Sequence, residues 1–126
     1  MIDHFSLGVS SLTKARAFYD RALAPLGYEA LYEIGGAVAY GPEAPHYIFW
    51  IGETRGAAVV PPAGFHVALI APDRAAVDRF HAEGLAAGGR EAGHPGPRPE
   101  YGETYYAAFV LDPDGHKIEA VCYRPD

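Results

Sequence analysis

Two histidines and one glutamate are the residues of this chain best placed to do chemistry together. His4 and His66 lie at matching points of two similar segments, and Glu119 lies in a run that is otherwise mostly apolar. If the two segments pack with pseudo-two-fold symmetry, the imidazoles can meet near the axis, and a buried carboxylate needs a partner. Two neutral imidazoles and a carboxylate form a facial triad that suits Fe(II), Mn, Ni or Zn and leaves positions open for substrate. We therefore predict a divalent metal site at these residues.

Aromatic residues supply candidates for substrate binding. Phe49 and Trp50 are neighbours on one predicted strand, so one of the two faces a pocket. Tyr105 and Tyr106 likewise point to opposite faces of a later strand, so at most one lines the pocket directly. We assign that place to Tyr106.

A segment rich in Gly and Pro at 92–103 is expected to be a polar loop, long enough to act as a lid. It contains Arg98 and Tyr101. The guanidinium of Arg98 suits a substrate carboxylate or phosphate. Both residues are therefore candidates for substrate binding.

The chain contains an internal repeat. Residues 4–27 and 66–89 share six identities when one segment is laid on the other, and these fall on equivalent points of the predicted elements. The matches are His4 with His66, Leu7 with Leu69, Phe18 with Phe80, Leu23 with Leu85, Ala24 with Ala86 and Gly27 with Gly89. Phe18 and Phe80 are expected in the core. The pattern indicates a duplicated unit.

Hydrophobic periodicity predicts the order β-α-β-β-β in each half. The first half has strands at 2–9, 28–34, 36–41 and 46–52 and a helix at 13–24; the second has strands at 64–71, 104–111 and 117–123 and a helix that begins near Pro72. Gly and Pro separate these segments. We predict one α+β domain, 1–126, with modules at 1–52 and 64–126 joined by a linker at 53–63.

Composition excludes several classes of function. The 126 residues include 16 acidic and 10 basic side chains, for a net charge of −6, so the basic surface of a nucleic-acid-binding protein is missing. No apolar run approaches the roughly 18 residues that a membrane span needs. One cysteine, Cys122, permits no internal disulfide, and we expect it to be buried and inert. These features favour a cytoplasmic protein that does not bind nucleic acid or membranes.

Three runs of the sequence resemble the vicinal oxygen chelate superfamily, which includes glyoxalase I, the bleomycin-resistance proteins and the extradiol dioxygenases. They are 3–9 (DHFSLGV), 64–68 (GFHVA) and 112–119 (DPDGHKIE), and the last is the most specific. The resemblance covers essentially the whole chain. It implies two tandem βαβββ modules that form an open, mixed, mostly antiparallel eight-stranded pair of half-barrels. In that family, metal ligands line the cupped interior, and His4, His66 and Glu119 match three ligand positions.

Glyoxalase I has a fourth ligand, an acid on the last strand of its first module. The repeat places Phe49 opposite Glu119, and a phenylalanine cannot bind a metal. A site with three ligands is closer to the dioxygenases. The resemblance implies a small substrate bound to the metal through neighbouring oxygens. Lyase, isomerase and dioxygenase chemistry all remain open, and His46, Glu53 and Tyr106 qualify as a general base only by residue type.

Two other functions fit the same sequence. A metal-free protein of the bleomycin-resistance type would bind an antibiotic or aromatic metabolite with Phe49, Trp50, Tyr101 and Tyr106, and the acidic charge would suit a cationic ligand. A structural or regulatory module with a vestigial site is the other. The family pairs modules within a chain or exchanges them between chains, so we expect a homodimer and leave open which chain supplies each ligand.

Overall fold

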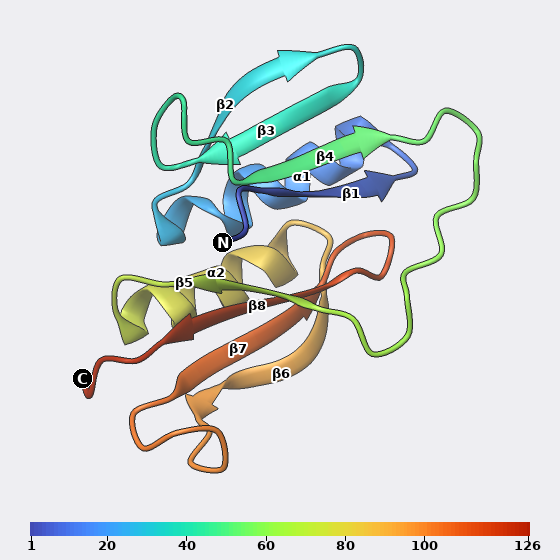
Figure 1. Ribbon diagram of the computed structural model, residues 1–126. Helices are drawn as coiled ribbons and strands as arrows, with labels where there is room; N and C mark the ends of the chain where they lie inside the picture. Colours follow the sequence, from blue (N-terminus) through green and yellow to red (C-terminus); the bar gives the residue numbers. More distant parts are fainter.

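The computed structural model describes all 126 residues and contains two α-helices and eight strands. The first module comprises β1 Phe5–Val9, α1 Leu12–Ala22, a 3-10 helix Ala24–Leu26, β2 Glu29–Ile34, β3 Ala37–Gly41 and β4 Phe49–Glu53. The second comprises β5 Val67–Ile70, α2 Arg74–Ala86, β6 Arg90–Pro97, β7 Tyr106–Leu111 and β8 Lys117–Cys122. The predicted order β-α-β-β-β is therefore confirmed in both halves (Figure 1), although β6 of the second half had been assigned no strand and overlaps the predicted loop.

Each module forms its own mixed sheet of four strands. The strand orders are β1-β4-β3-β2 and β5-β8-β7-β6, so the two sheets have the same topology. In each, the first strand runs parallel to the last, and the remaining pairs are antiparallel. A parallel pair needs a crossover connection, which α1 and α2 provide. The sheets are not closed into a barrel, in agreement with the predicted α+β fold of two open halves.

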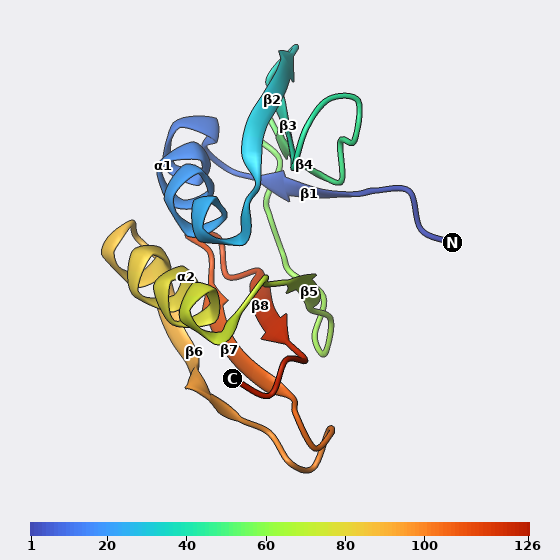
Figure 2. The ribbon, with the colours of Figure 1, turned by 90° about the vertical axis from the view of Figure 1, so that its left-hand side faces the viewer.

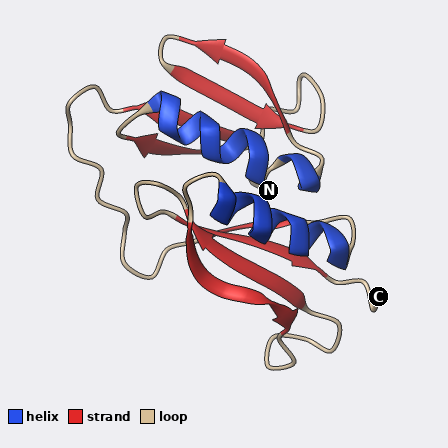
Figure 3. Cartoon of the chain, turned by 180° about the vertical axis from the view of Figure 1, so that it is seen from behind, coloured by secondary structure: helices blue, strands red, loops and turns tan.

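Both helices lie on the same side of the two sheets and pack against each other (Figures 2 and 3). Ser11 caps α1 by accepting a hydrogen bond from the backbone of Lys14, and Asp73 caps α2 in the same way. Across the helix pair, the guanidinium of Arg21 lies 2.6 Å from the carboxylate of Glu83. These two residues are 62 positions apart, which is the offset of the repeat. Neither helix is long and apolar enough to cross a membrane.

A hydrophobic core of 23 buried residues runs through both modules. Phe18 and Phe80, equivalent in the repeat, are both fully buried, as predicted. Gly89 is required for this packing, because a Cβ there would lie 2.5 Å from the ring of Phe18 and 2.7 Å from the carbonyl oxygen of Gly84. Cys122 is free and buried, also as predicted. The modules therefore share one core.

The Asp-Pro-Asp-Gly turn between β7 and β8 joins the second module to the first. Asp112 is fully buried, and its carboxylate accepts hydrogen bonds from the Tyr19 hydroxyl at 2.6 Å and from the backbone N–H groups of Asp114 and His116. The Nε2 atom of His116 lies 2.8 Å from the carbonyl oxygen of Gly8. Burial and the nearby Asp112 carboxylate raise the pKa of Tyr19, so its hydroxyl stays protonated. The turn therefore has a structural role.

The predicted loop at 92–103 is wrong in its first half, because β6 extends through Pro97. Two features made this strand hard to recognise. It is an edge strand, where proline is tolerated because one side of the backbone needs no partner. Its pairing with β7 is also interrupted by register shifts at 91–93 and 93–96, which break the alternation of side chains. Only the segment between β6 and β7 remains as a loop.

Two tyrosines provide a matched test of the buried Asp112 network. The hydroxyls of Tyr19 and Tyr40 both donate to an aspartate at 2.6 Å, and both rings are fully buried, but the Asp20 partner of Tyr40 is 44% exposed. We expect Tyr19→Phe to lower the free energy of unfolding by about 1–3 kcal/mol, because the buried carboxylate loses a donor that water cannot replace. Tyr40→Phe should cost less than about 1 kcal/mol.

Urea denaturation of the two variants and the wild type measures this difference. An equal loss of stability in both variants would contradict the structural role of Asp112.

Candidate functional site

Alternation along the strands gives each sheet a core face and an open face, the latter turned away from the helices. In β8, Ile118, Ala120 and Cys122 belong to the core, so Glu119 between them points to the open face. In β4, Ile51 belongs to the core and Trp50 beside it does not. The open faces are therefore where side chains such as Glu119 can bind a metal ion.

Glu119 is the centre of a polar group on the open face of the second sheet. Its side chain is 2% exposed, and its Oε1 atom lies 2.9 Å from Nε2 of His66. Its Oε2 atom accepts a hydrogen bond from the Tyr105 hydroxyl. Burial and the bond to Glu119 raise the pKa of Tyr105, so this hydroxyl stays protonated and acts as a donor near neutral pH. Two of the three predicted ligands are thus in contact.

The strand register explains how His66 reaches Glu119. Ala68 of β5 is the parallel partner of Glu119, and His66 precedes Ala68 by two residues, so the two lie on the same face. On the other side, Phe109 of β7 pairs with Glu119 and packs its ring 5.8 Å from that of His66. Sheet geometry alone therefore brings the imidazole, the carboxylate and an aromatic ring together.

His4 lies apart from this pair. Its Nδ1 atom is 2.6 Å from the Asp3 carboxylate, and both side chains are exposed. It lines an open cavity of about 680 Å³ on the first module, together with His46, Tyr47 and Trp50 among others. The ligand atoms of His4, His66 and Glu119 do not all come within 4.8 Å of one another in one chain.

Trp50, not Phe49, is the structural equivalent of Glu119. In the first sheet, Ser6 pairs with Trp50, and in the second, Ala68 pairs with Glu119. Ser6 and Ala68 are related by the repeat offset, so the sequence alignment that set Phe49 opposite Glu119 was wrong by one residue. An indole at this position still supplies no metal ligand.

Two of the predicted substrate-binding residues point the wrong way. Phe49 is fully buried and packs against Phe5, Tyr19 and Tyr40 in the core. Tyr106 faces α2, where its hydroxyl donates to Asp78 at 2.7 Å. The alternation of Tyr105 and Tyr106 was predicted correctly, but the choice of face was not, because both faces of β7 carry apolar residues.

The other three predicted substrate-binding residues are at least partly exposed, so a substrate can contact them: Arg98, Tyr101 and Trp50. The guanidinium of Arg98 lies 5.7 Å from the ring centroid of Phe109 and donates to the carbonyl oxygens of three neighbouring residues. Those bonds use three of its five N–H groups, which leaves donors for an anion. Tyr101 is 63% exposed and its ring lies 5.5 Å from that of Tyr105.

Trp50 belongs to an aromatic cluster on the open face of the first sheet. Its ring lies 6.2 Å from that of Tyr32 and 6.1 Å from that of Tyr47, and the two tyrosines stack at 5.8 Å. The cluster borders the cavity that contains His4. A second hollow of about 410 Å³, between β1 and the linker, contains none of the predicted ligands.

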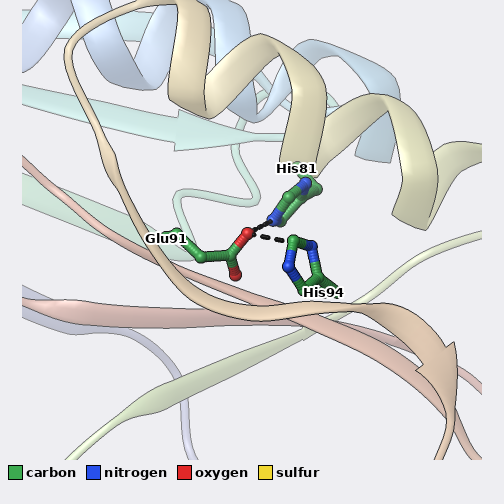
Figure 4. A group of neighbouring side chains, drawn as sticks. All are labelled: His81, Glu91 and His94. Atoms are coloured by element: carbon green, nitrogen blue, oxygen red, sulfur yellow. Dashed lines mark hydrogen bonds and ion pairs between the residues drawn. The ribbon is translucent and has the colours of Figure 1, made fainter.

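A further group of potential ligands lies between α2 and β6. His81, Glu91 and His94 place their ligand atoms within 4.8 Å of one another (Figure 4). This group was not predicted from the sequence, since residues 92–103 were expected to form a loop and His81 had no assigned role. Hydrophobic periodicity could not predict this contact, because it results from the irregular pairing of β6 with β7.

These contacts define what the open face can do chemically. The Glu119 carboxylate and the His66 imidazole offer two adjacent ligand atoms. The neutral phenol of Tyr105 can donate a proton or a hydrogen bond beside them. Phe109 and Arg98 add an apolar wall and a positive charge beside them.

Comparison with known proteins agrees with the fold. Residues 1–120 match the model of the Glyoxalase/Bleomycin resistance protein/Dioxygenase superfamily. A glyoxalase/bleomycin resistance protein from Albidiferax ferrireducens T118 is 31% identical, with a TM-score of 0.86 and 99% of each chain covered. No curated protein matches the chain.

More distant structures share the fold alone. A glyoxalase-related enzyme from Fulvimarina pelagi is 20% identical, with a TM-score of 0.74 over 97% of this chain and 87% of that one. A glyoxalase I mutant from Zea mays is 22% identical, with a TM-score of 0.74 over 95% of this chain and 45% of that one. The match over residues 1–120 decides the family: the chain belongs to the Glyoxalase/Bleomycin resistance protein/Dioxygenase superfamily.

Proposed function

We propose that this protein is a metal-dependent enzyme of the vicinal oxygen chelate type. It binds a divalent ion with His4, His66 and Glu119 and takes a small substrate through two neighbouring oxygens. The observation that carries this proposal is the contact between the buried Glu119 carboxylate and the partly exposed imidazole of His66 on the open face. A carboxylate in such a place needs a positive or hydrogen-bonding partner, which a metal ion supplies well.

The geometry of the pair fits a shared ion. Nitrogen and oxygen ligands lie about 2.1 Å from Zn and similar ions, so two adjacent ligands of one octahedral ion are about 3 Å apart. The observed separation of Nε2 and Oε1 is 2.9 Å. Tyr105 holds the other carboxylate oxygen and fixes the orientation of the ligand. On the first module, Asp3 holds Nδ1 of His4 and leaves Nε2 free to bind.

We place the third ligand on a second copy of the chain. His4 does not join His66 and Glu119 within one chain. The two modules contact each other through the side of the sheets that carries the helices, which leaves the open faces uncovered (Figure 2). The open faces, in contrast, expose apolar side chains, including Ile70 at 67% and Tyr32 at 46%. Exposed apolar surface beside an incomplete polar site favours a homodimer, in which His4 of one protomer completes the site of its partner.

When bound, the ion acts as a Lewis acid on a substrate oxygen or as an oxygen-activating centre. The residues around it define how a substrate is held. The ring of Phe109 offers an apolar wall, and the free N–H groups of Arg98 offer bonds to a carboxylate or phosphate. Tyr105, protonated near neutral pH, can donate a hydrogen bond to negative charge that develops beside Glu119. We also propose that the enzyme is cytoplasmic, because its single cysteine is free and no disulfide calls for an oxidising compartment.

Complementation between inactive variants tests the shared site. His4→Ala and His66→Ala should each abolish binding of Ni(II) or Mn(II), because each removes one ligand. After the two variants are mixed under conditions that exchange protomers, half of the dimers are mixed and each contains one intact site. Metal analysis should then recover about a quarter of the wild-type content. All proteins carry His94→Ala, so that the group between α2 and β6 does not contribute.

A mixture of His66→Ala with Glu119→Gln is the matched control. Both changes lie in the same module, so no mixed dimer contains an intact site, and no metal should be recovered. If the first mixture also recovers none while wild type binds metal, the site does not combine His4 and His66 from different chains. If wild type with His94→Ala binds none, the metal enzyme proposal fails.

Tyr105 and Tyr106 provide a second test, because they are adjacent but point to opposite faces. We expect Tyr105→Phe to weaken metal binding about tenfold without changing its stoichiometry, since Glu119 loses the donor that orients it. Tyr106→Phe should leave the metal affinity unchanged. Calorimetric titration with Ni(II) in the His94→Ala background measures both values, and equal affinities in the two variants would show that Tyr105 does not support a metal ligand.

The aromatic cluster favours one alternative, a metal-free binding protein for an antibiotic or aromatic metabolite. Tyr32, Tyr47 and Trp50 form a surface on which a planar ligand can stack, and Asp3 and Glu43 place negative charge at the same cavity. Trp50 is the only tryptophan, so its fluorescence reports on this surface alone. Quenching by bleomycin that persists in EDTA and in His66→Ala would favour the binding protein over the enzyme.

A further inference from the structure

His81, Glu91 and His94 form a compact group on the helix side of the second sheet. Nε2 of His81 lies 2.7 Å from Oε2 of Glu91, and Nδ1 of His94 lies 3.1 Å from the same oxygen (Figure 4). The two imidazole rings are 5.7 Å apart. Two nitrogen atoms and one oxygen atom therefore converge on one point between α2 and β6.

A bulge in β6 brings the two strand residues to the same face. In a regular strand, residues three positions apart point to opposite faces. Here Glu91 pairs with Val110 and Gly93 pairs with Phe109, so two steps on β6 correspond to one step on β7. The extra residue reverses the alternation, and Glu91 and His94 both face α2.

Glu91 and Gly93 stabilise this bulge. The Oε1 atom of Glu91 accepts a hydrogen bond from the backbone N–H of Gly93 at 2.6 Å, which leaves Oε2 free to face the two histidines. A Cβ on Gly93 would lie 2.7 Å from the ring of Phe109, so the position requires glycine. Although desolvation opposes it, the bonds from Gly93 and His81 lower the pKa of Glu91, and the carboxylate is ionised at neutral pH.

The two histidines differ in how firmly they are held. The side chain of His81 is 10% exposed and is fixed by the buried face of α2, whereas that of His94 is 83% exposed. A site of this kind has two ligand residues held by the fold and a third that can adjust from the surface. It also leaves coordination positions open toward water.

We propose that His81, Glu91 and His94 bind a divalent transition-metal ion such as Zn(II), separately from the site on the open face. Two imidazoles and one carboxylate are the donor set that Zn(II) and its neighbours in the first row accept. The ligand atoms are close enough to meet one ion after small rotations of exposed side chains, since all lie within 4.8 Å of one another. The ion would link α2 to the edge strand β6.

This site is distinct from the proposed catalytic one in position. Glu119 and His66 lie on the open face, whereas Glu91 and His94 face α2 on the other side of the same sheet. The proposal therefore stands whether or not the enzyme hypothesis is correct. The competing explanation is that His81 and His94 only make ion pairs with Glu91, in which case added metal would not bind there.

Zinc titration of His66→Ala separates these explanations, because this variant lacks a ligand of the open-face site. We expect about one equivalent of Zn(II) per chain and a rise in melting temperature, since binding to the folded state stabilises it. Adding His94→Ala should weaken zinc binding at least tenfold without changing the melting temperature of the metal-free protein, because the His94 side chain is largely exposed.

The matched control is His46→Ala in the same background, which removes another exposed imidazole outside the group. It should leave zinc affinity unchanged. NMR spectra should also locate the ion, with zinc shifting the ring resonances of His81 and His94 and the amide of Gly93. Zinc binding that is equally strong with and without His94, or absent altogether at millimolar concentration, would overturn the proposal.

Discussion

The arrangement of the two modules depends on one buried carboxylate. Asp112 receives the hydroxyl of Tyr19 from the first module and two backbone N–H groups from its own turn. Its burial is tolerable only because every donor is in place, since an unpaired charge in the core would be strongly destabilising. The same turn leads directly into β8, which carries Glu119. The interaction that joins the modules thus also sets the position of the strand on which the open-face site is built.

Much of the fold and part of the site were predictable from the sequence because they follow from local alternation and from the repeat. The order of elements, the core role of Phe18 and Phe80, and the pairing of His66 with Glu119 are of this kind. The assignments that failed depend on which face of a strand meets the helices. Phe49 and Tyr106 sit on strands with apolar residues on both faces, so periodicity does not distinguish core from open face.

Irregular backbone explains the rest. The bulge in β6 depends on the contact between Gly93 and Phe109. These residues lie on different strands and meet only in the folded sheet, so the local sequence pattern does not reveal the contact. Without the bulge, Glu91 and His94 would point to opposite faces and the group around His81 would not form. Position 81 is the repeat equivalent of position 19. In the first module this helix residue is a tyrosine that joins the modules, and in the second it is a histidine that faces its own sheet.

The ion pair between Arg21 and Glu83 is an interaction that a fused chain can form and a dimer of identical single modules cannot. The two residues occupy equivalent places and meet across the pseudo-axis. Two identical modules in this arrangement would bring each side chain against its own copy, arginine against arginine or glutamate against glutamate, with repulsion in either case. Joining the modules in one chain lets the two copies of a position diverge in charge. A symmetric repulsion is thereby replaced by an asymmetric attraction between the modules.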